Sequence, residues 1–206
     1  MPWCIVLRIT LAASRGYNFG GKISNCTFGS STTDGSSVSS THIYGRVGGI
    51  VGSTSGTVTS CTNNGTVSSS GTTVWAGGIT AYIDGNTLSG CYNNGSVSAS
   101  GSSSAKAGGI VGQSTVSSTV SDCTNQGSAT VTDTPEAYVG GIVGTNENST
   151  VSGCTNNGSA SATDCTQSYA GGIVGNNDSN GTVEDNNINN GTPTTNVGNE
   201  KISESE

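Results

Sequence analysis

Five residues able to contact a ligand recur at matching positions along this chain of 206 residues. Each stands four residues before the isoleucine of a Gly-Gly-Ile segment, and the set is Arg46, Trp75, Lys106, Tyr138 and Tyr169. Stacked in register, these side chains would form one column of aromatic rings and cations. Sugar rings stack on aromatic faces, so the column is a candidate glycan-binding site. Packing at a strand edge with cation–π contacts explains the same residues without a ligand.

A second candidate surface consists of threonines that share another register. Its members are Thr57, Thr87, Thr119, Thr150 and Thr182. Two residues further along stand Thr59, Ser89, Ser121, Ser152 and Glu184. Ice-binding β-solenoids present flat double arrays of this kind, whereas threonine is also favoured on any exposed strand. Ice binding is therefore the alternative function.

Five of the seven cysteines share a register of their own: Cys26, Cys61, Cys91, Cys123 and Cys154. Zinc sites usually use close pairs such as C-x2-C, and the chain has none. Side chains that stack in register point in parallel, which suits a disulfide poorly. We predict a buried column of small apolar thiols, with a metal site or a disulfide frame as alternatives. Cys165 lies outside the register and is the candidate reactive thiol.

We predict no catalytic residues and no cofactor. The acidic residues are scattered along the chain, and His42 is the only histidine. Polysaccharide-active enzymes need clustered carboxylates, or a carboxylate with a cation as base, and a Ser-His-Asp arrangement has one possible centre here. A fragment of a β-helix polysaccharide-active enzyme remains the second alternative to a non-enzymatic function.

The segments that must position these columns are repeated sequence motifs. Five Gly-Gly-Ile segments place their isoleucines at steps of 29, 31, 32 and 31 residues. A second motif reads Thr, aliphatic, small polar, any residue, Cys, any residue, Asn, Asn or Gln, Gly. A period of this size indicates one structural unit stacked on copies of itself. We predict two buried columns, one of Ile50, Ile79, Ile110, Ile142 and Ile173, the other of Val58, Leu88, Val120, Val151 and Val183.

These repeats predict an all-β fold, a right-handed parallel β-solenoid with about 31 residues per coil and five to six coils. We expect three strands per coil: over Gly-Gly-Ile-Val-Gly, over Thr-Val-Ser-x-Cys, and after Asn-Asn-Gly. The Asn-Gly pairs are expected to supply positive φ at the corners. Val58 and Cys61 cannot both be buried by strict alternation, so a bend is expected between them. Stacked asparagines such as Asn63 and Asn93 are expected to form an amide ladder.

Composition and charge exclude several classes of function. Apolar residues make up 31% of the chain, too few for an ordinary compact core. The net charge of −7, with six scattered cations, cannot neutralise a phosphate backbone, so nucleic-acid binding is not expected. No apolar run approaches the roughly 18 residues of a membrane helix.

The repeated pattern resembles the GLUG-motif repeat, a family named for its Gly-Leu-hydrophobic-Gly core. The resemblance covers about residues 20–191, with Ile in place of Leu, and Thr80-Ala81 departs from it. It implies a large secreted or surface-attached bacterial protein, such as an adhesin, and no catalytic residues that could be transferred.

We divide the chain into an N-terminal strand, cap or truncated segment at 1–19, a β-solenoid at 20–191 and a polar tail at 192–206. The function expected is that of a non-enzymatic, extracellular structural or adhesive module. Its expected partners are a surface glycan or a protein of a host or neighbouring cell. End-to-end association with a second copy is also expected, because the ends of a solenoid are unpaired sheet edges.

Overall fold

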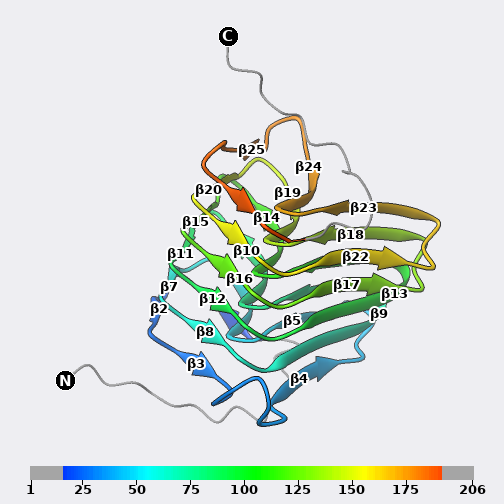
Figure 1. The fold of residues 1–206 in the computed structure, drawn as a ribbon, viewed down its shortest axis with the longest axis horizontal. Helices are drawn as coiled ribbons and strands as arrows, with labels where there is room; N and C mark the ends of the chain where they lie inside the picture. The colour runs from blue at the N-terminus through cyan, green and yellow to red at the C-terminus, as the bar shows by residue number, and fades with distance from the viewer. Residues whose placement is uncertain (1–15, 192–206) are drawn as a thin grey trace.

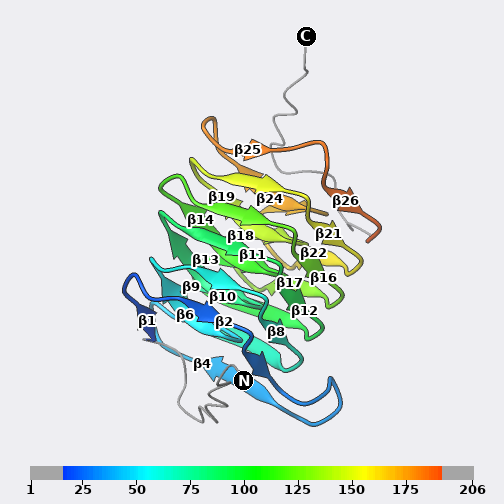
Figure 2. The same ribbon diagram turned by 90° about the vertical axis from the view of Figure 1, so that its left-hand side faces the viewer.

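A computed structural model gives the structure of residues 16–191. Its described residues contain no helix, and all strand pairs are parallel. The chain winds into about five turns, about 31 residues apart, so the predicted β-solenoid is confirmed. Figures 1 and 2 show the coils stacked along one axis, with the two ends of the described chain at opposite ends of the stack. The segments 1–15 and 192–206 lie outside the described residues, as does Cys4.

Each coil contributes to four sheets, which we call A, B, C and D. Sheet A contains, in spatial order, β1 (Tyr17–Asn18), β6 (Val51–Thr54), β10 (Thr80–Asp84), β14 (Val111–Thr115), β19 (Val143–Asn146) and β24 (Val174–Asn177). Sheet B contains β2 (Ile23–Ser24), β7 (Val58–Thr59), β11 (Thr87–Ser89), β15 (Thr119–Ser121), β20 (Thr150–Ser152) and β25 (Thr182–Val183).

Sheets C and D complete each coil. Sheet C contains β3 (Thr27–Phe28), β8 (Thr62–Asn63), β12 (Tyr92–Asn93), β16 (Thr124–Asn125), β21 (Thr155–Asn156) and β26 (Ile188–Asn189). Sheet D contains β4 (Ser37–Ser40), β5 (Arg46–Gly48), β9 (Thr66–Gly77), β13 (Val97–Gly108), β17 (Ala129–Thr132), β18 (Glu136–Gly140), β22 (Ala160–Thr163) and β23 (Gln167–Gly171). β1 already pairs with β6, so pairing begins just before residue 20.

The expectation of three strands per coil was wrong in two places. The Gly-Gly-Ile segment is a corner, because the strand of sheet D ends at its first glycine and the strand of sheet A begins after its isoleucine. The Thr-Val-Ser-x-Cys segment is divided between sheets B and C by a residue with positive φ, such as Ser60 at 53° or Gly90 at 60°. This is the bend expected between Val58 and Cys61, and it lets both point inward.

The glycines of the Asn-Asn-Gly segments do not have the positive φ expected of them. They are needed for close approach between coils. A Cβ on Gly95 would collide with the carbonyl of Gly65, and one on Gly127 would collide with the carbonyl of Gly95. Adding any side chain at these positions would push neighbouring coils apart.

Two apolar cores lie side by side inside the coil. The first, between sheets A, B and C, holds the isoleucine, valine and cysteine columns. The second lies within sheet D, whose chain runs out to a tip and back, so that Val67 and Val74 of β9 belong to one cluster. Alanines dominate this second core, which explains how a chain with few large apolar residues still excludes water.

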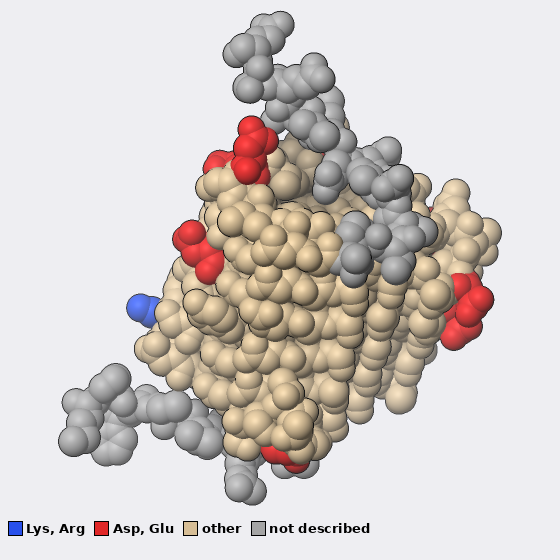
Figure 3. All heavy atoms as spheres, viewed as in Figure 1, with Lys and Arg blue, Asp and Glu red and all other residues tan. Residues whose placement is uncertain are grey.

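The outer face seen in Figure 3 is nearly uncharged and is ribbed by side chains stacked along the axis. It carries sheet C and the outward wall of sheet D, as Figure 1 shows from the same direction. Its regular texture follows from the parallel register, which places equivalent residues of successive coils over one another.

The buried asparagines of sheet C form the expected ladder. Each Nδ2 donates to Oδ1 of the next coil, from Asn63 to Asn93 at 2.7 Å, from Asn93 to Asn125 at 2.8 Å and from Asn125 to Asn156 at 2.9 Å. Nδ2 also donates to the carbonyl oxygen two residues later, and Oδ1 accepts from the amide there, as Asn125 does with Gly127. The ladder therefore ties each corner both to itself and to its neighbours.

We predict that Asn125→Ala lowers the free energy of unfolding by at least about 2 kcal/mol, because it leaves buried donors and acceptors of three coils unpaired. The measurement is urea unfolding followed by circular dichroism. Gln126→Ala is the matched control, since its side chain is exposed at the next position. Equal stability of the two variants would contradict a structural role for the ladder.

Candidate functional site

The five residues Arg46, Trp75, Lys106, Tyr138 and Tyr169 form one column on the outer face of sheet D. They pair consecutively across β5, β9, β13, β18 and β23. We call them the cation–aromatic column. They point away from the alanine-rich core because they alternate with buried neighbours such as Val74 and Ala76. All five are half-buried.

The rings of this column face along the solenoid axis. Arg46 Cζ lies 5.0 Å from the ring centroid of Trp75, and Lys106 Nζ lies 6.0 Å from Trp75 and 5.6 Å from Tyr138. The rings of Tyr138 and Tyr169 are stacked, with centroids 5.2 Å apart and planes inclined by 5°. Cations and rings thus cover the faces inside the column. Among the described members of the column, Tyr169 at the C-terminal end is the one whose outer ring face has neither a cation nor a ring of the column stacked on it.

A second column, on sheet A, adjoins the first and was missed in the sequence. It lies three residues after each isoleucine and consists of Ser53, Tyr82, Gln113, Thr145 and Asn176. Trp75 Nε1 and Lys106 Nζ both donate to Gln113 Oε1, and Arg46 lies 4.3 Å from the ring of Tyr82. The constant offset of three residues from each isoleucine was the one signal that could have revealed it, because the residue types vary.

Lys106 is one of the two cationic side chains of this site, beside Arg46. Its side chain is 15% exposed, and its ammonium lies 3.5 Å from a carboxylate oxygen of Glu147. Burial lowers the pKa of Lys106 below the usual value, and the nearby Glu147 opposes that shift. Burial also raises the pKa of Tyr138, with Glu136 adding to the effect.

The hydroxyl of Thr145 is the one buried side-chain polar atom without a hydrogen-bond partner in the described part of the chain. It stands next to Gln113 in the sheet A column. Together the two columns offer rings, cations, amides and a hydroxyl. This chemistry suits recognition of a neutral or weakly acidic polar ligand.

The predicted column of threonines is present on sheet B. Thr87, Thr119, Thr150 and Thr182 pair consecutively, and Thr57 precedes the pair formed by Val58 and Leu88. The first four members, in chain order, are half-buried, and Thr182 is exposed. On the adjoining sheet C the outward column is Thr62, Tyr92, Thr124, Thr155 and Ile188, so a ring and an isoleucine interrupt it. Ice binding stays a prediction.

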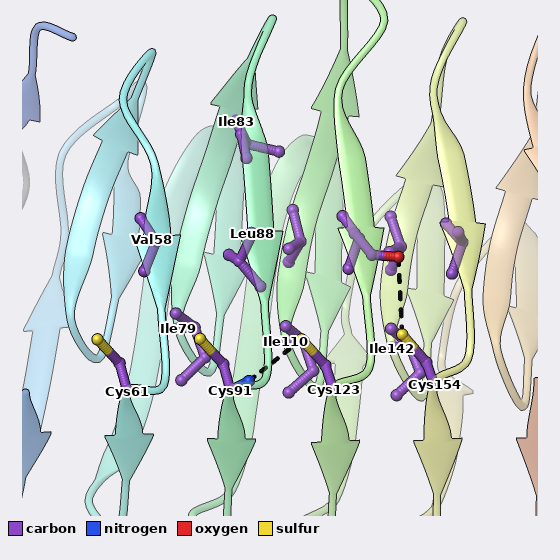
Figure 4. Packing of buried hydrophobic residues seen from close by; sticks show 14 of the residues in the cluster. Val58, Cys61, Ile79, Ile83, Leu88, Cys91, Ile110, Cys123, Ile142 and Cys154 are labelled. Carbon is purple, nitrogen blue, oxygen red and sulfur yellow. Dashed lines mark hydrogen bonds between the residues drawn. The ribbon is translucent and has the colours of Figure 1, made fainter. Parts of the chain in front are cut away.

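The predicted core columns occupy the first apolar core. Figure 4 shows Ile79, Ile110 and Ile142 in line, and the sulfurs of Cys61, Cys91, Cys123 and Cys154 pointing the same way. Backbone amides join each isoleucine to the next, from Ile50 to Ile79 and onward to Ile173. Val58, Leu88, Val120 and Val151 pair in register and are fully buried.

The end members of these columns depart from the prediction of burial. Ile50, Cys26 and Val183 are only partly buried, because each lacks a neighbour on one side among the described residues. Ile173 remains 7% exposed. A column buries its interior members completely and its ends incompletely, as a stack must.

The cysteines of the column are free thiols. Each donates to the carbonyl two residues earlier, as Cys61 Sγ does to Thr59 at 3.3 Å. Burial raises the pKa of Cys123 well above its usual value. The described residues hold no group of three or more His, Cys, Asp and Glu side chains able to bind a metal. Cys165, also free, lies near the tip of sheet D and donates to the carbonyl of Thr163.

The residues considered for catalysis lie apart and serve turns. His42 Nδ1 accepts a hydrogen bond from the amide of Tyr44 in an exposed loop. Asp34 accepts from the amide of Ser36 and from Ser30, which hold its pKa well below the usual value. Asp178 accepts from the amides of Asn148 and Asn180. No helix in the described residues is long and apolar enough to cross a membrane.

Parallel coils with columns in register define a β-solenoid repeat protein. The family model described as the GLUG motif matches residues 136–163, consistent with a GLUG-motif repeat protein. The match runs from the first residue of β18 to the last of β22, which is one full coil. Neither the curated proteins nor the solved structures gave a match to the chain.

The lowered pKa of Lys106 predicts a pH-dependent stability. Between the folded-state pKa and the unfolded value of 10.5, the unfolded chain holds more protons, so stability rises with pH in that window. We expect Lys106→Met to remove this gain, so that its melting temperature falls relative to wild type between pH 7 and about 10. Above that range the raised pKa of Tyr138 lowers the stability of the fold as pH rises. Lys22→Met, at an exposed site, is the control. Parallel profiles for Lys106→Met and wild type would refute the argument.

Proposed function

We propose that this chain is a non-enzymatic structural and adhesive module of an extracellular bacterial surface protein. The observation that carries the proposal is that the polar columns are engaged by their own neighbours from coil to coil. The asparagine ladder, the cation–aromatic column and the turn carboxylates all bond within the chain. Such side chains hold a rod together and are not poised for a reaction.

The repeat family supports the extracellular setting. The family match covers one coil, and the same registers continue through the other coils. A stack of identical units is a spacer whose length follows the number of coils. The free thiols do not conflict with an oxidising compartment, because the four interior ones are buried and point in parallel.

The location is tested on intact cells of the source organism. Antibodies against the purified chain should label unpermeabilised cells, and added protease should remove the labelling, because a surface module is accessible from outside. A cytoplasmic marker protein is the control for cell integrity. Labelling that requires permeabilised cells would contradict the proposal.

The finer function proposed for the adhesive part is glycan binding at the cation–aromatic column. Because the inner ring faces are covered, Tyr169 is the residue whose ring can take a sugar, with polar side chains of the sheet A column such as Asn176 on the adjacent strand. The alternative partner is a protein of a host or neighbouring cell.

On a glycan array we expect Tyr169→Ala to weaken retention at least about fivefold, since stacking of this kind contributes about 1 kcal/mol or more. Tyr92→Ala removes an exposed ring from sheet C and is the matched control. Circular dichroism verifies the fold of both variants. Absence of retained glycans, or retention that Tyr169→Ala leaves unchanged, would exclude this site.

A further inference from the structure

We propose that copies of this chain stack head to tail, with the C-terminal coil of one copy seated against the N-terminal coil of the next. The inference does not depend on the proposed function. The last strands of sheets A, B and C at one end are β24, β25 and β26, and at the other end β1, β2 and β3. Both sets continue the register of the interior coils. On sheet D the last described strands belong to the preceding coil, so the junction uses the other three sheets.

The backbone of sheet B gives this junction its register. In β25, the amides of Thr182 and Glu184 donate to Ser149 and Val151 of the preceding coil at 2.8 and 3.0 Å. Hydrogen-bonding groups alternate along a parallel strand, so the N–H and C=O of Val183 face away from the preceding coil.

At the N-terminal end the hydrogen-bonding groups of the strand alternate in the same way, but the bonded groups face the following coil. In β2, the amides of Ile23 and Asn25 donate toward the following coil, to Thr57 at 2.9 Å and Thr59 at 3.2 Å. The N–H and C=O of Ser24 therefore face away from it. Placing Val183 against Ile23 of a second copy lets Val183 N–H donate to the carbonyl of Lys22. It also lets Ser24 N–H donate to the carbonyl of Val183, as in the interior coils.

The side chains at the two ends belong to the same columns and match in residue type. Val183 and Ile23 are partly buried members of the same apolar column and would complete its burial. On sheet A, Asn146 Nδ2 donates to Asn177 Oδ1 at 2.7 Å, and Asn18 Nδ2 donates to Thr54 at 3.1 Å. Both bonds point toward the C-terminal end, so Asn177 Nδ2 donating to Asn18 of the next copy keeps that direction.

The buried asparagine column of sheet C changes residue type at the junction. Phe28 occupies the position that asparagines hold in the interior of sheet C, and it would face Asn189 of the other copy. An amide can donate to an aromatic face, although such a contact is weaker than the ladder. The amide ladder of sheet C therefore ends at each junction, which makes the junction weaker than an interior coil contact.

Charge favours a second copy as the occupant. Glu184 and Lys22 are both exposed, and in this register they are diagonal neighbours on the outer face of sheet B. Opposite charges at such positions attract, even though the chain as a whole carries a net charge of −7. Because the two contacting surfaces differ, the association is open and produces chains of copies.

Sedimentation velocity on the full chain tests the inference with two proline variants. Val183→Pro and Ser24→Pro each remove an N–H that faces away from the adjacent coil, and proline is tolerated on edge strands. Wild type should form species beyond the dimer as concentration rises. Each variant alone should remain monomeric. An equimolar mixture should form dimers and nothing larger, because each variant keeps the end that the other lacks.

The mixture separates loss of an interface from loss of folding, since an unfolded variant could not regain association. A wild-type chain that stays monomeric at all concentrations would overturn the proposal, and so would variants that associate like wild type. A mixture of variants that stays monomeric while both melt like wild type would also overturn it. That result would indicate that another occupant, such as residues 192–206 or a different protein, covers the edge.

Discussion

Register between coils is the constraint on which this structure depends. Each coil buries its apolar side chains only because the next coil places an equivalent residue directly beside them. The backbone bonds that set this spacing run through all four sheets, and the asparagine ladder repeats the constraint with side chains at the sheet C corner. A shift of one residue would exchange the inward and outward faces and bury threonine in place of valine.

The same constraint explains which residue types occur. Close approach at the corners excludes a Cβ, so glycine is required at Gly95 and its equivalents for reasons of space and not of φ. The narrow lobe of sheet D accepts alanine and valine, and the wider first core accepts isoleucine and leucine. The low apolar content is thus what two thin cores need.

Much of the architecture could be predicted from the sequence because the repeats of one chain place equivalent residues in the same local structure. The periodic isoleucines and asparagines indicated both columns and the ladder. The division into four sheets could not be predicted, since it depends on single positive-φ residues as different as Ser60, Gly90 and Asp122. The sheet A column was also missed, because Tyr82, Gln113 and Thr145 share a place but no chemistry.

The tip of sheet D, where the chain turns back, differs from the rest of the coil. The register of β9 and β13 shifts there between Gly101 and Ser104, and β17 and β18 are separated by a short turn at residues 133–135. Part of the difference in coil length is absorbed at this tip, and the rest at the turn between sheets A and B, which has two residues between β10 and β11 and three between β14 and β15. The tip of sheet D is one place where a foreign loop could be inserted, so that a series of inserts would be displayed at the strand spacing of about 4.8 Å along one side of the rod.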